Sequence, residues 1–429
     1  MRDAVITEIG TLVRGPASGP HSGQNGPPDE PESVLDLVED AAVIIEDGTV
    51  VAAGPSKAVL SDHPPATAAE VIDAAGGIVL PGLVDAHTHA AFVGDRADEF
   101  VMKLRGKSYQ EIAEAGGGIM RTVEAVRQCS EDAIIDRLTS HLDVMVSHGS
   151  TTVEVKTGYG LNVEHELRLL RAINEVDHPV RVVPTFMGAH AVPPDATAEE
   201  YVDRVIDDQL PAVADQGIAR FCDVFCDEGA FTAEQARRVL EAGRTHGLTP
   251  KLHADEFARI GGSTLAADLR ATSADHLLQS TTDDADQLAA AGVTPVFLPA
   301  TALALDTPYA NPRPFLAAGG EIALATDFNP NCHAPALPFT ATLGCVGMRL
   351  TPAEAVRAIT TGGAAALATD PEQVPALPPH VGQLTPGSPG DAVVVDVPSL
   401  DHLPYRFGDN RVCAVVIDGA VVYQNDPPG

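Results

Sequence analysis

Short apolar runs that alternate with helical patterns are the feature of this sequence that most restricts its fold. Between about residues 77 and 370 there are eight such runs, which read GIVLPGLVDAH, TTVEVKTGYG, VRVVPTFMGAH, ARFCDVFCDEG, LTPKLHADEF, ATSADHLL, VTPVFLPA and EIALATDF. Segments between them, such as residues 164–175 and 232–247, carry apolar residues at spacings of three and four, and Thr232 is placed as an N-cap. Eight strand–helix units over roughly 250 residues or more predict an α/β protein with a (β/α)8, TIM-like barrel.

Both ends of the chain read as β-structure. Residues 42–54, AVIIEDGTVVAAG, and residues 412–423, VCAVVIDGAVVY, each place Asp-Gly between two apolar runs, which is typical of a hairpin with a type I′ turn. A further strand-like run, DAVVVDV, covers residues 391–397. We therefore predict a small β-sandwich domain formed by residues 1–76 and 371–429, around a barrel of residues 77–370. Residues 15–32, rich in Gly, Pro and Ser, are predicted as a surface loop of that domain.

Charge and hydropathy patterning exclude several classes of protein. The chain has 27 basic and 60 acidic residues, a net charge of −33, so a surface for nucleic acid is not expected. No run reaches the roughly 18–20 apolar residues that cross a bilayer, and MRDAVITEIG lacks the apolar core of a signal peptide. We expect a cytoplasmic protein without a membrane partner, whose six cysteines stay thiols.

The excess of acidic residues also bears on the cell that makes the protein. Such a surface repels itself unless salt screens it. The composition therefore suggests a salt-rich cytoplasm, although a GC-rich genome would explain the same bias.

Histidine gathers where the predicted strands end. His87 and His89 end the first run, and because alternate residues of a strand share a face, both imidazoles can point into one cavity. His253 and Asp327 end the fifth and eighth runs. Barrel enzymes carry their chemistry at the C-terminal ends of the strands, and imidazole with carboxylate suits one zinc or iron ion that keeps a position for water. Although a lone His-x-His also fits polar decoration, we predict that these four residues bind one metal ion.

Two more polar residues stand near these ends. His276 ends the sixth run and is predicted beside the metal's water, with a fifth-ligand role as the alternative. Glu256, three residues after His253, is predicted as the base that takes the proton of the attacking water and returns it to the leaving nitrogen; the alternative is a solvated loop residue. A second metal would need a bridging group, often a modified lysine on the fourth strand, and the fourth run has no lysine. Lys156 on the second run is assigned a supporting role and no catalytic one.

With these residues in place, the chain resembles the amidohydrolase superfamily, whose members share PGLVDAHTH. Within it, the chain is similar to the imidazolonepropionase family in the order and spacing of VGDRADEF, GKSYQEI, AGGGI, KTGYGL, MGAH, KLHADEF, ADHLL and TDFNP. The resemblance extends over nearly the whole chain. It implies metal-dependent hydrolysis of the cyclic amide of 4-imidazolone-5-propanoate, a small anionic substrate, to N-formimino-L-glutamate in histidine degradation. It also implies a homodimer.

The resemblance further assigns residues that bind the substrate. Arg96 and Tyr159 would hold the propionate, because guanidinium binds carboxylate through two hydrogen bonds and a phenol donates one. Tyr109 and His190 would contact the ring or the carboxylate, and Asn329 would fix the substrate. The alternatives are structural: a surface ion pair of Arg96, buried tyrosines, a structural histidine and an asparagine that stabilises its loop.

The chain departs from the family pattern after Asn329-Pro330. Asn331, Cys332 and His333 stand where small residues resembling Gly-Ser are expected, which leaves the shape of the substrate loop open. Two other functions also remain open at this point. One is a deaminase of the same superfamily that acts on a purine or pyrimidine-like base, which the arginine matched to a carboxylate disfavours. The other is a metal-free interaction protein, which would not need the four predicted ligands.

Overall fold

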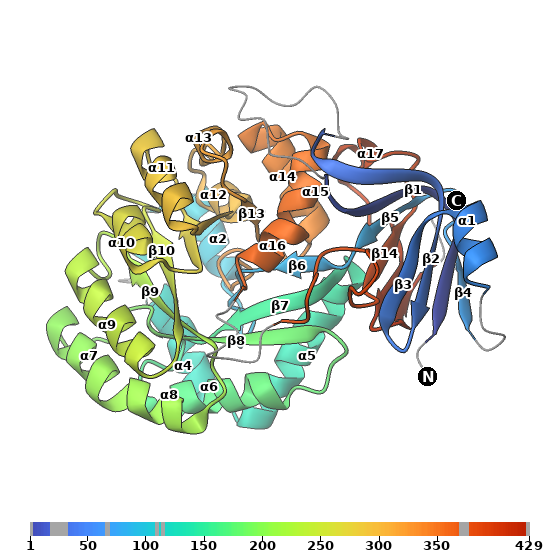
Figure 1. Ribbon diagram of the computed structural model, residues 1–429. Coiled ribbons are helices and arrows are strands. Elements are labelled where there is room, and N and C mark those ends of the chain that lie inside the picture. The colour runs from blue at the N-terminus through green and yellow to red at the C-terminus, as the bar shows by residue number, and fades with distance from the viewer. Residues whose placement is uncertain are drawn as a thin grey trace.

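Eight parallel strands form the centre of the molecule (Figure 1). The computed structural model describes residues 3–17, 33–64, 69–107, 111–112, 116–368 and 377–425. Neighbouring barrel strands pair in chain order: β6 (Leu83–Asp85), β7 (Ser150–Lys156), β8 (Arg181–Ala189), β9 (Phe221–Cys226), β10 (Thr249–Ala254), β11 (Ser273–His276), β12 (Thr294–Phe297) and β13 (Ala323–Leu324). A parallel bridge between Thr88 and Phe328 joins the chain after β6 to the chain after β13. The (β/α)8 barrel is confirmed.

The first predicted run is divided between two sheets. Its beginning forms β5 (Ile78–Pro81), which pairs with strands of the terminal domain, and only its end forms β6 of the barrel. The break falls at Gly82, where an added Cβ would lie 2.2 Å from Oγ1 of Thr151. No other side chain fits this close approach, so the chain can pass directly from one sheet into the other.

Helices surround the barrel, as the spacing of apolar residues predicted (Figure 1). Thr232 caps the helix after it through Gln235, and buried residues such as Leu169 and Val239 face the strands. The helices of the described chain are α1 (Ser56–Asp62), α2 (Ala97–Leu104), α4 (Ile119–Gln128), α5 (Glu131–Ser147), α6 (Val163–Glu175), α7 (Ala198–Arg204), the π-helical turn η2 (Val205–Gln209), α8 (Leu210–Gln216), α9 (Ala233–Thr245), α10 (Gly262–Leu269), α11 (Thr282–Ala291), α12 (Pro299–Leu305), α13 (Arg313–Ala317), α14 (Leu337–Met348), α15 (Pro352–Ala358), α16 (Thr361–Ala365) and α17 (His402–Tyr405).

Strands from both termini form the second domain, at the right of Figure 1. Hydrogen bonds join them in one mixed sheet in the order β16-β15-β14-β5-β1-β2-β3, with β4 beside β1. The predicted hairpins are confirmed: Asp47-Gly48 and Asp418-Gly419 have positive φ at both positions, as a type I′ turn requires. The bounds are β1 (Ala4–Pro16), β2 (Leu35–Glu46), β3 (Thr49–Pro55), β4 (Glu70–Asp73), β14 (Ala392–Val395), β15 (Val412–Ile417) and β16 (Ala420–Gln424).

Parts of the predicted domain division cannot be placed. Gly15 and Pro16, the first residues of the predicted surface loop, lie in β1 instead. Residues 18–32 of that loop and the predicted boundary at 370/371 lie outside the described residues. The division at residues 370/371 therefore stays a prediction. The division at 76/77 comes too early in the chain, because β5 (Ile78–Pro81) belongs to the terminal sheet and the barrel begins after it, at β6.

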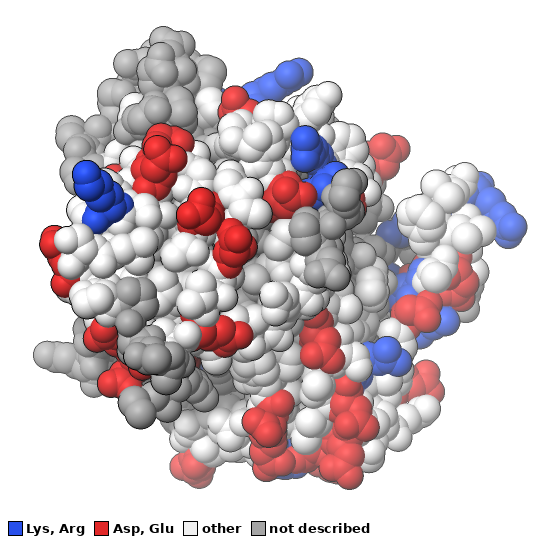
Figure 2. Space-filling view, turned by 90° about the vertical axis from the view of Figure 1, so that its right-hand side faces the viewer, with Lys and Arg blue, Asp and Glu red and all other residues white. Residues whose placement is uncertain are grey.

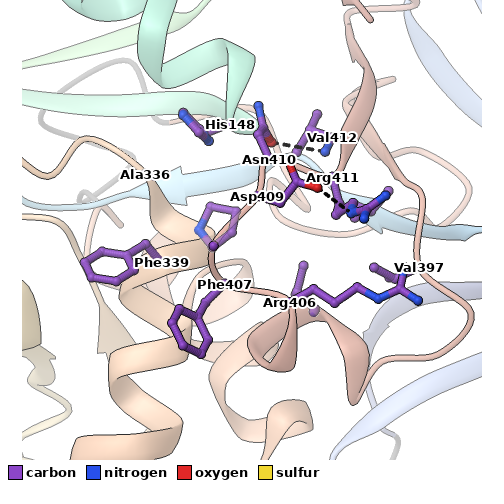
Figure 3. Close-up of a pocket in the computed structure, with 14 residues that line it drawn as sticks. His148, Ala336, Phe339, Val397, Arg406, Phe407, Asp409, Asn410, Arg411 and Val412 are labelled. Carbon is purple, nitrogen blue, oxygen red and sulfur yellow. Dashed lines mark hydrogen bonds and ion pairs between the residues drawn. The ribbon is translucent and has the colours of Figure 1, made fainter. Parts of the chain in front are cut away.

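The two domains meet over polar contacts as well as apolar ones. Arg181 at the start of β8 reaches Asp391 at 2.9 Å and Asp418 at 3.1 Å in the terminal domain. On another part of this junction, a cavity of about 200 Å³ lies between the barrel helices and residues 406–412 (Figure 3). There Asn410 donates to the carbonyl of Ser147 at 2.9 Å. This cavity shares no lining residue with the histidine cluster described below.

The surface fits the composition. Acidic side chains are spread over the face in Figure 2 more widely than basic ones. Among the described residues, no helix is both long and apolar enough to span a membrane. All six cysteines are free, as expected.

Candidate active site

The four predicted metal ligands converge at the C-terminal ends of the barrel strands. His87 and His89 follow β6, His253 lies on β10 and Asp327 follows β13. Oδ1 of Asp327 lies 3.5 Å from Nε2 of His87 and 3.6 Å from Nε2 of His89. Nε2 of His253 is 3.4 Å from Nε2 of His89. Four side chains that are far apart in the sequence therefore aim nitrogen and oxygen atoms at one point.

Two buried carboxylates orient two of these imidazoles. Nδ1 of His87 lies 2.6 Å from Oδ2 of Asp275, and Nδ1 of His253 lies 3.1 Å from Oδ1 of Asp223. Because a carboxylate accepts, each Nδ1 donates and each Nε2 is left with its lone pair directed at the cluster.

The imidazoles of the cluster are also neutral, and one of them has a nitrogen without a hydrogen-bond partner, as a metal site needs. Burial, chiefly, lowers the pKa of His87 and of His89 well below the usual 6.5, so both rings are neutral. Nε2 of His87 is buried and has no hydrogen-bond partner in the described part of the chain. Neutral imidazoles with an unsatisfied Nε2 beside a carboxylate fit a divalent metal ion.

A second group of possible ligands lies deeper in the barrel and is already filled by a lysine. Asp223, His253 and Asp275 bring ligand atoms within 4.8 Å of one another. Nζ of Lys156 lies 2.7 Å from Asp223 and 3.8 Å from Asp275. The ammonium takes the place that a second cation would occupy, so the geometry favours one metal ion.

Lys156 belongs to a fully buried set of charges beneath the histidines, which we call the buried charge network: Glu154, Lys156, Asp223, Lys251 and Asp275. Nζ of Lys156 is also 2.7 Å from Glu154, whose other oxygen is 3.1 Å from Nζ of Lys251. The supporting role predicted for Lys156 agrees with this placement. With Asp327, these residues leave an excess of two negative charges, which a divalent ion balances.

Sequence reasoning missed most of this network. The available signal was the alternation of charged residues along apolar strands, Glu154 and Lys156 on β7 and Lys251 and His253 on β10. Residues two apart on a strand share a face, so each pair had to point into the barrel together.

The two predicted catalytic residues lie beside the cluster. Oε2 of Glu256 is 3.6 Å from Nε2 of His276, and both side chains are buried. Burial first, and then the charges of Asp327 and Asp227, raise the pKa of Glu256 well above its usual value. His276 and Asp327 have φ of +80° and +49°, so the chain is in the left-handed region at two of the strand ends that carry the site.

A cavity of about 560 Å³ opens over this cluster. Its walls include Arg96, Tyr159, His190 and Asn329, all predicted to bind substrate, together with Glu256, His276 and three of the predicted ligands. Tyr109, the remaining predicted residue, lies outside the described residues. Their roles in binding the substrate stay predictions.

Several of the residues that line the cavity also make the structural contacts that were the alternative to substrate binding. Arg96 lines the cavity and also pairs with Glu99, with Nη2 2.6 Å from Oε2. Nδ1 of His190 donates to the carbonyl oxygen of Gly158 at 3.1 Å, and its ring stacks on His89 with centroids 4.8 Å apart. Burial lowers the pKa of His190 to about 3, so the ring is neutral and Nδ1 donates. Asn329 accepts from the backbone of Asn331 at 2.8 Å and so shapes its own loop.

The loop that departs from the family pattern forms part of the cavity wall. Asn331 lines the cavity, Cys332 is buried, and His333 packs its ring against Phe328 with centroids 4.9 Å apart. Nζ of Lys103, a residue that sequence reasoning did not single out, donates to Oδ1 of Asn331 at 2.5 Å and also lines the cavity.

Comparisons with known proteins identify the family. The amidohydrolase family model matches residues 78–422. The chain is 54% identical to the imidazolonepropionase of Halobacterium salinarum over 98% of this chain and 97% of that one. It is 44% identical to the imidazolonepropionase of Geobacillus kaustophilus over 92% of each chain.

Solved structures share the fold at low sequence identity. The guanine deaminase of E. coli has a TM-score of 0.69 at 18% identity and covers 99% of this chain and all of its own. The atrazine chlorohydrolase from Arthrobacter aurescens TC1, complexed with zinc, has a TM-score of 0.67 at 18% identity and covers 99% of this chain and 96% of its own.

Proposed function

The chain belongs to the amidohydrolase family and, within it, to the imidazolonepropionases, and we propose how its residues divide the work of that reaction. The enzyme hydrolyses the cyclic amide of 4-imidazolone-5-propanoate to N-formimino-L-glutamate, a step of histidine degradation. The amide carbon becomes a carboxylate, and the ring nitrogen that leaves it stays on the formimino group. Glu256 and His276 lie beside the histidine–aspartate cluster in one cavity, and this placement supports the roles that we propose for them.

His87, His89, His253 and Asp327 would hold the metal ion. When bound, it supplies the Lewis acidity that makes water a nucleophile near neutral pH and polarises the amide carbonyl. The buried charge network keeps two of the imidazoles aimed at it. The ion is divalent, and zinc is our proposal over iron, because the fold relative complexed with zinc carries that metal on the same architecture.

Glu256 moves the proton. One oxygen of its carboxylate takes the proton from the attacking water and then delivers it to the ring nitrogen as the C–N bond breaks. Its buried position and raised pKa make it hold that proton more readily than an exposed glutamate would. Glu256 lies 3.6 Å from His276, so both groups can reach the same amide bond of a substrate in the cavity.

His276 stabilises the charge that develops on the carbonyl oxygen. Burial, above all, lowers its pKa well below 6.5, so the ring is neutral. A neutral His276 with its proton on Nε2 donates into the cavity, where the oxygen becomes negative in the transition state. Arg96 and Tyr159 hold the propionate at the other end of the substrate, His190 and Tyr109 contact the ring or the carboxylate, and Asn329 helps to fix the substrate.

The test is an assay of the purified enzyme, with metal analysis, against 4-imidazolone-5-propanoate and a panel of aminopurines and aminopyrimidines. We expect hydrolysis of the imidazolone alone. In Glu256→Gln we expect turnover to fall by about 10²–10⁴-fold, the usual contribution of a proton-transfer group, while the metal content stays that of the wild type. Near-normal turnover would exclude Glu256 as the base.

Two further proposals concern the protein as a whole. We propose a cytoplasmic location, which six free cysteines support because a reducing compartment keeps thiols unpaired. We also propose a homodimer, which light scattering of the purified protein tests directly.

A further inference from the structure

We propose that Lys103 on α2 binds the substrate's carboxylate and supplies the uncompensated positive charge that selects an acidic tail. This inference rests on the proposed function, in which the substrate carries a propionate. Arg96 is the residue that the family resemblance assigns to that carboxylate. The structure indicates that Arg96 cannot supply the selectivity by itself.

The charge of Arg96 is already neutralised inside the protein. Its Nε and Nη2 lie 2.7 and 2.6 Å from the same oxygen of Glu99. Glu99 is 1% exposed, and its other oxygen accepts from the backbone of Gly118 at 3.0 Å. A guanidinium bound to a buried carboxylate still offers N–H groups of fixed geometry, but the pair brings no net charge to the cavity.

Lys103 stands in a different electrostatic position. It lies seven residues after Arg96, which is two helical turns, so both side chains project from the same face of α2 into the cavity. Its Nζ donates to a neutral amide oxygen, that of Asn331. Within the described ranges, no carboxylate lies at ion-pair distance from Nζ. Lys103 is therefore the cation of the cavity wall whose charge is free to meet a substrate.

Asn331 positions this ammonium without cancelling its charge. The backbone N–H of Asn331 donates to Oδ1 of Asn329 at 2.8 Å, which fixes the residue that holds Lys103. An ammonium has three donors, and the amide of Asn331 takes one of them. A glycine at this position, as the family pattern leads one to expect, would offer no side-chain acceptor. The departure at Asn331 thus has a physical reason: it holds Lys103 at the rim of the cavity.

The negative net charge of the protein makes an unpaired cation such as Lys103 important for binding an anionic substrate. The whole chain carries −33, so an anionic substrate approaches a molecule that repels it. Glu228 and Glu256 also line the cavity. Only a positive charge that is not already paired can offset this repulsion where the carboxylate binds, and a hydrogen bond to a charged group is stronger than one to a neutral group.

The experiment compares Lys103→Met with the wild type on two substrates, 4-imidazolone-5-propanoate and the same compound with its carboxylate converted to a carboxamide. For the carboxylate we expect KM to rise by about 10- to 100-fold with kcat within about twofold. For the carboxamide we expect no change, because no charge is left to recognise. Lys103→Arg, which keeps the charge, should stay close to the wild type on the carboxylate.

The matched control is Lys107→Met, which removes a lysine four residues further along the chain, past the end of α2. Nζ of Lys107 pairs with Glu111 at 2.6 Å, and its side chain is 54% exposed, so both KM values should stay unchanged. If Lys103→Met leaves the carboxylate KM unchanged, or weakens both substrates equally, Lys103 only ties its helix to the loop and the proposal is wrong.

Failure of the proposed function can be told apart from failure of this inference. If the wild type hydrolyses neither compound, the proposed reaction is wrong whatever Lys103 does. Calorimetric binding of the two compounds to Glu256→Gln, with and without Lys103→Met, still measures whether Lys103 discriminates the carboxylate from the carboxamide. If Glu256→Gln and the double variant with Lys103→Met prefer the carboxylate over the carboxamide by the same factor, the inference is wrong, and this result does not depend on turnover.

Discussion

Beneath the metal-site histidines, every carboxylate of the buried charge network meets a lysine or a histidine and none is exposed to water. On the outer surface, acidic side chains face water and outnumber the basic ones. The two regions are built from the same residue types. Buried charges interact strongly in pairs because little solvent screens them, whereas exposed charges interact weakly in pairs and over long distances as a group.

This difference separates the tasks of the two regions. The network determines where the imidazole nitrogens point. Its effect on the site therefore depends on single contacts, such as the 2.6 Å hydrogen bond between His87 and Asp275. The surface determines how the stability of the whole molecule responds to salt, and this response depends on the sum of the surface charges. Removing salt should therefore affect the surface most, and removing one residue should affect the network most.

The largest effect that we expect is that of salt on folding. The Debye length falls from about 30 Å at 0.01 M to about 3 Å at 1 M, so molar KCl removes most of the repulsion among 60 acidic residues. The thermal unfolding midpoint should rise strongly between low and molar KCl. Calorimetry at both salt concentrations measures this rise. A midpoint that does not change with salt would reject the idea that the acidic surface is adapted to a salt-rich cytoplasm.

The next effect is that of Lys156→Met, which leaves Glu154, Asp223 and Asp275 without their shared cation. Breaking a buried ion pair from one side costs about 3–5 kcal/mol, because an unpaired charge stays in a medium that cannot solvate it. Urea unfolding in molar KCl should show this loss, and metal analysis should show reduced occupancy. The control Lys107→Met removes an exposed lysine and should leave both measurements unchanged. If the free energy of unfolding falls by less than about 1 kcal/mol, the buried charge network contributes no more to stability than an ordinary surface ion pair.

The contrast between the regions also explains what could be predicted from the sequence. The predicted ligands follow from local rules, since each ends an apolar run and barrel sites collect at such ends. The type I′ hairpins and the cap at Thr232 are local in the same sense. Two partners of Lys156, Asp223 and Asp275, are not local: they depend on which strands lie near one another in the barrel. Neither is the bond between Lys103 and Asn331, which joins residues 228 apart in the chain.

The split of the first run shows a second limit of sequence reasoning. Hydropathy treats residues 77–87 as one strand, because every residue of both halves is buried. The break at Gly82 is set by contact with Thr151 on a neighbouring strand, which appears only when the two domains are assembled. Patterns in the sequence predict which residues are buried more readily than which sheet buries them.

A smaller effect is expected from Asp275→Asn, which keeps the shape of the side chain and removes its charge. His87 would lose the charged acceptor of its Nδ1, and residues that support a metal ligand in this way typically change affinity by about 10–100-fold. Competition with a chelator measures the dissociation constant of the metal. The matched control is Asp143→Asn, which alters an Asp–His pair at 3.3 Å whose aspartate is 68% exposed. If both variants bind metal as the wild type does, Asp275 does not support the ligand through its charge.

The smallest effect should come from a single pair on the surface. Arg171 lies 2.8 Å from Glu131, and their side chains are 44% and 27% exposed. Exposed pairs of this kind contribute about 0–1 kcal/mol, so Arg171→Gln should change the free energy of unfolding by less than that in low salt and by nothing measurable in molar KCl. Urea unfolding at both salt concentrations gives the two values. A larger loss that persists in molar KCl would mean that this surface pair behaves like the buried network, and that burial is not what distinguishes the two regions.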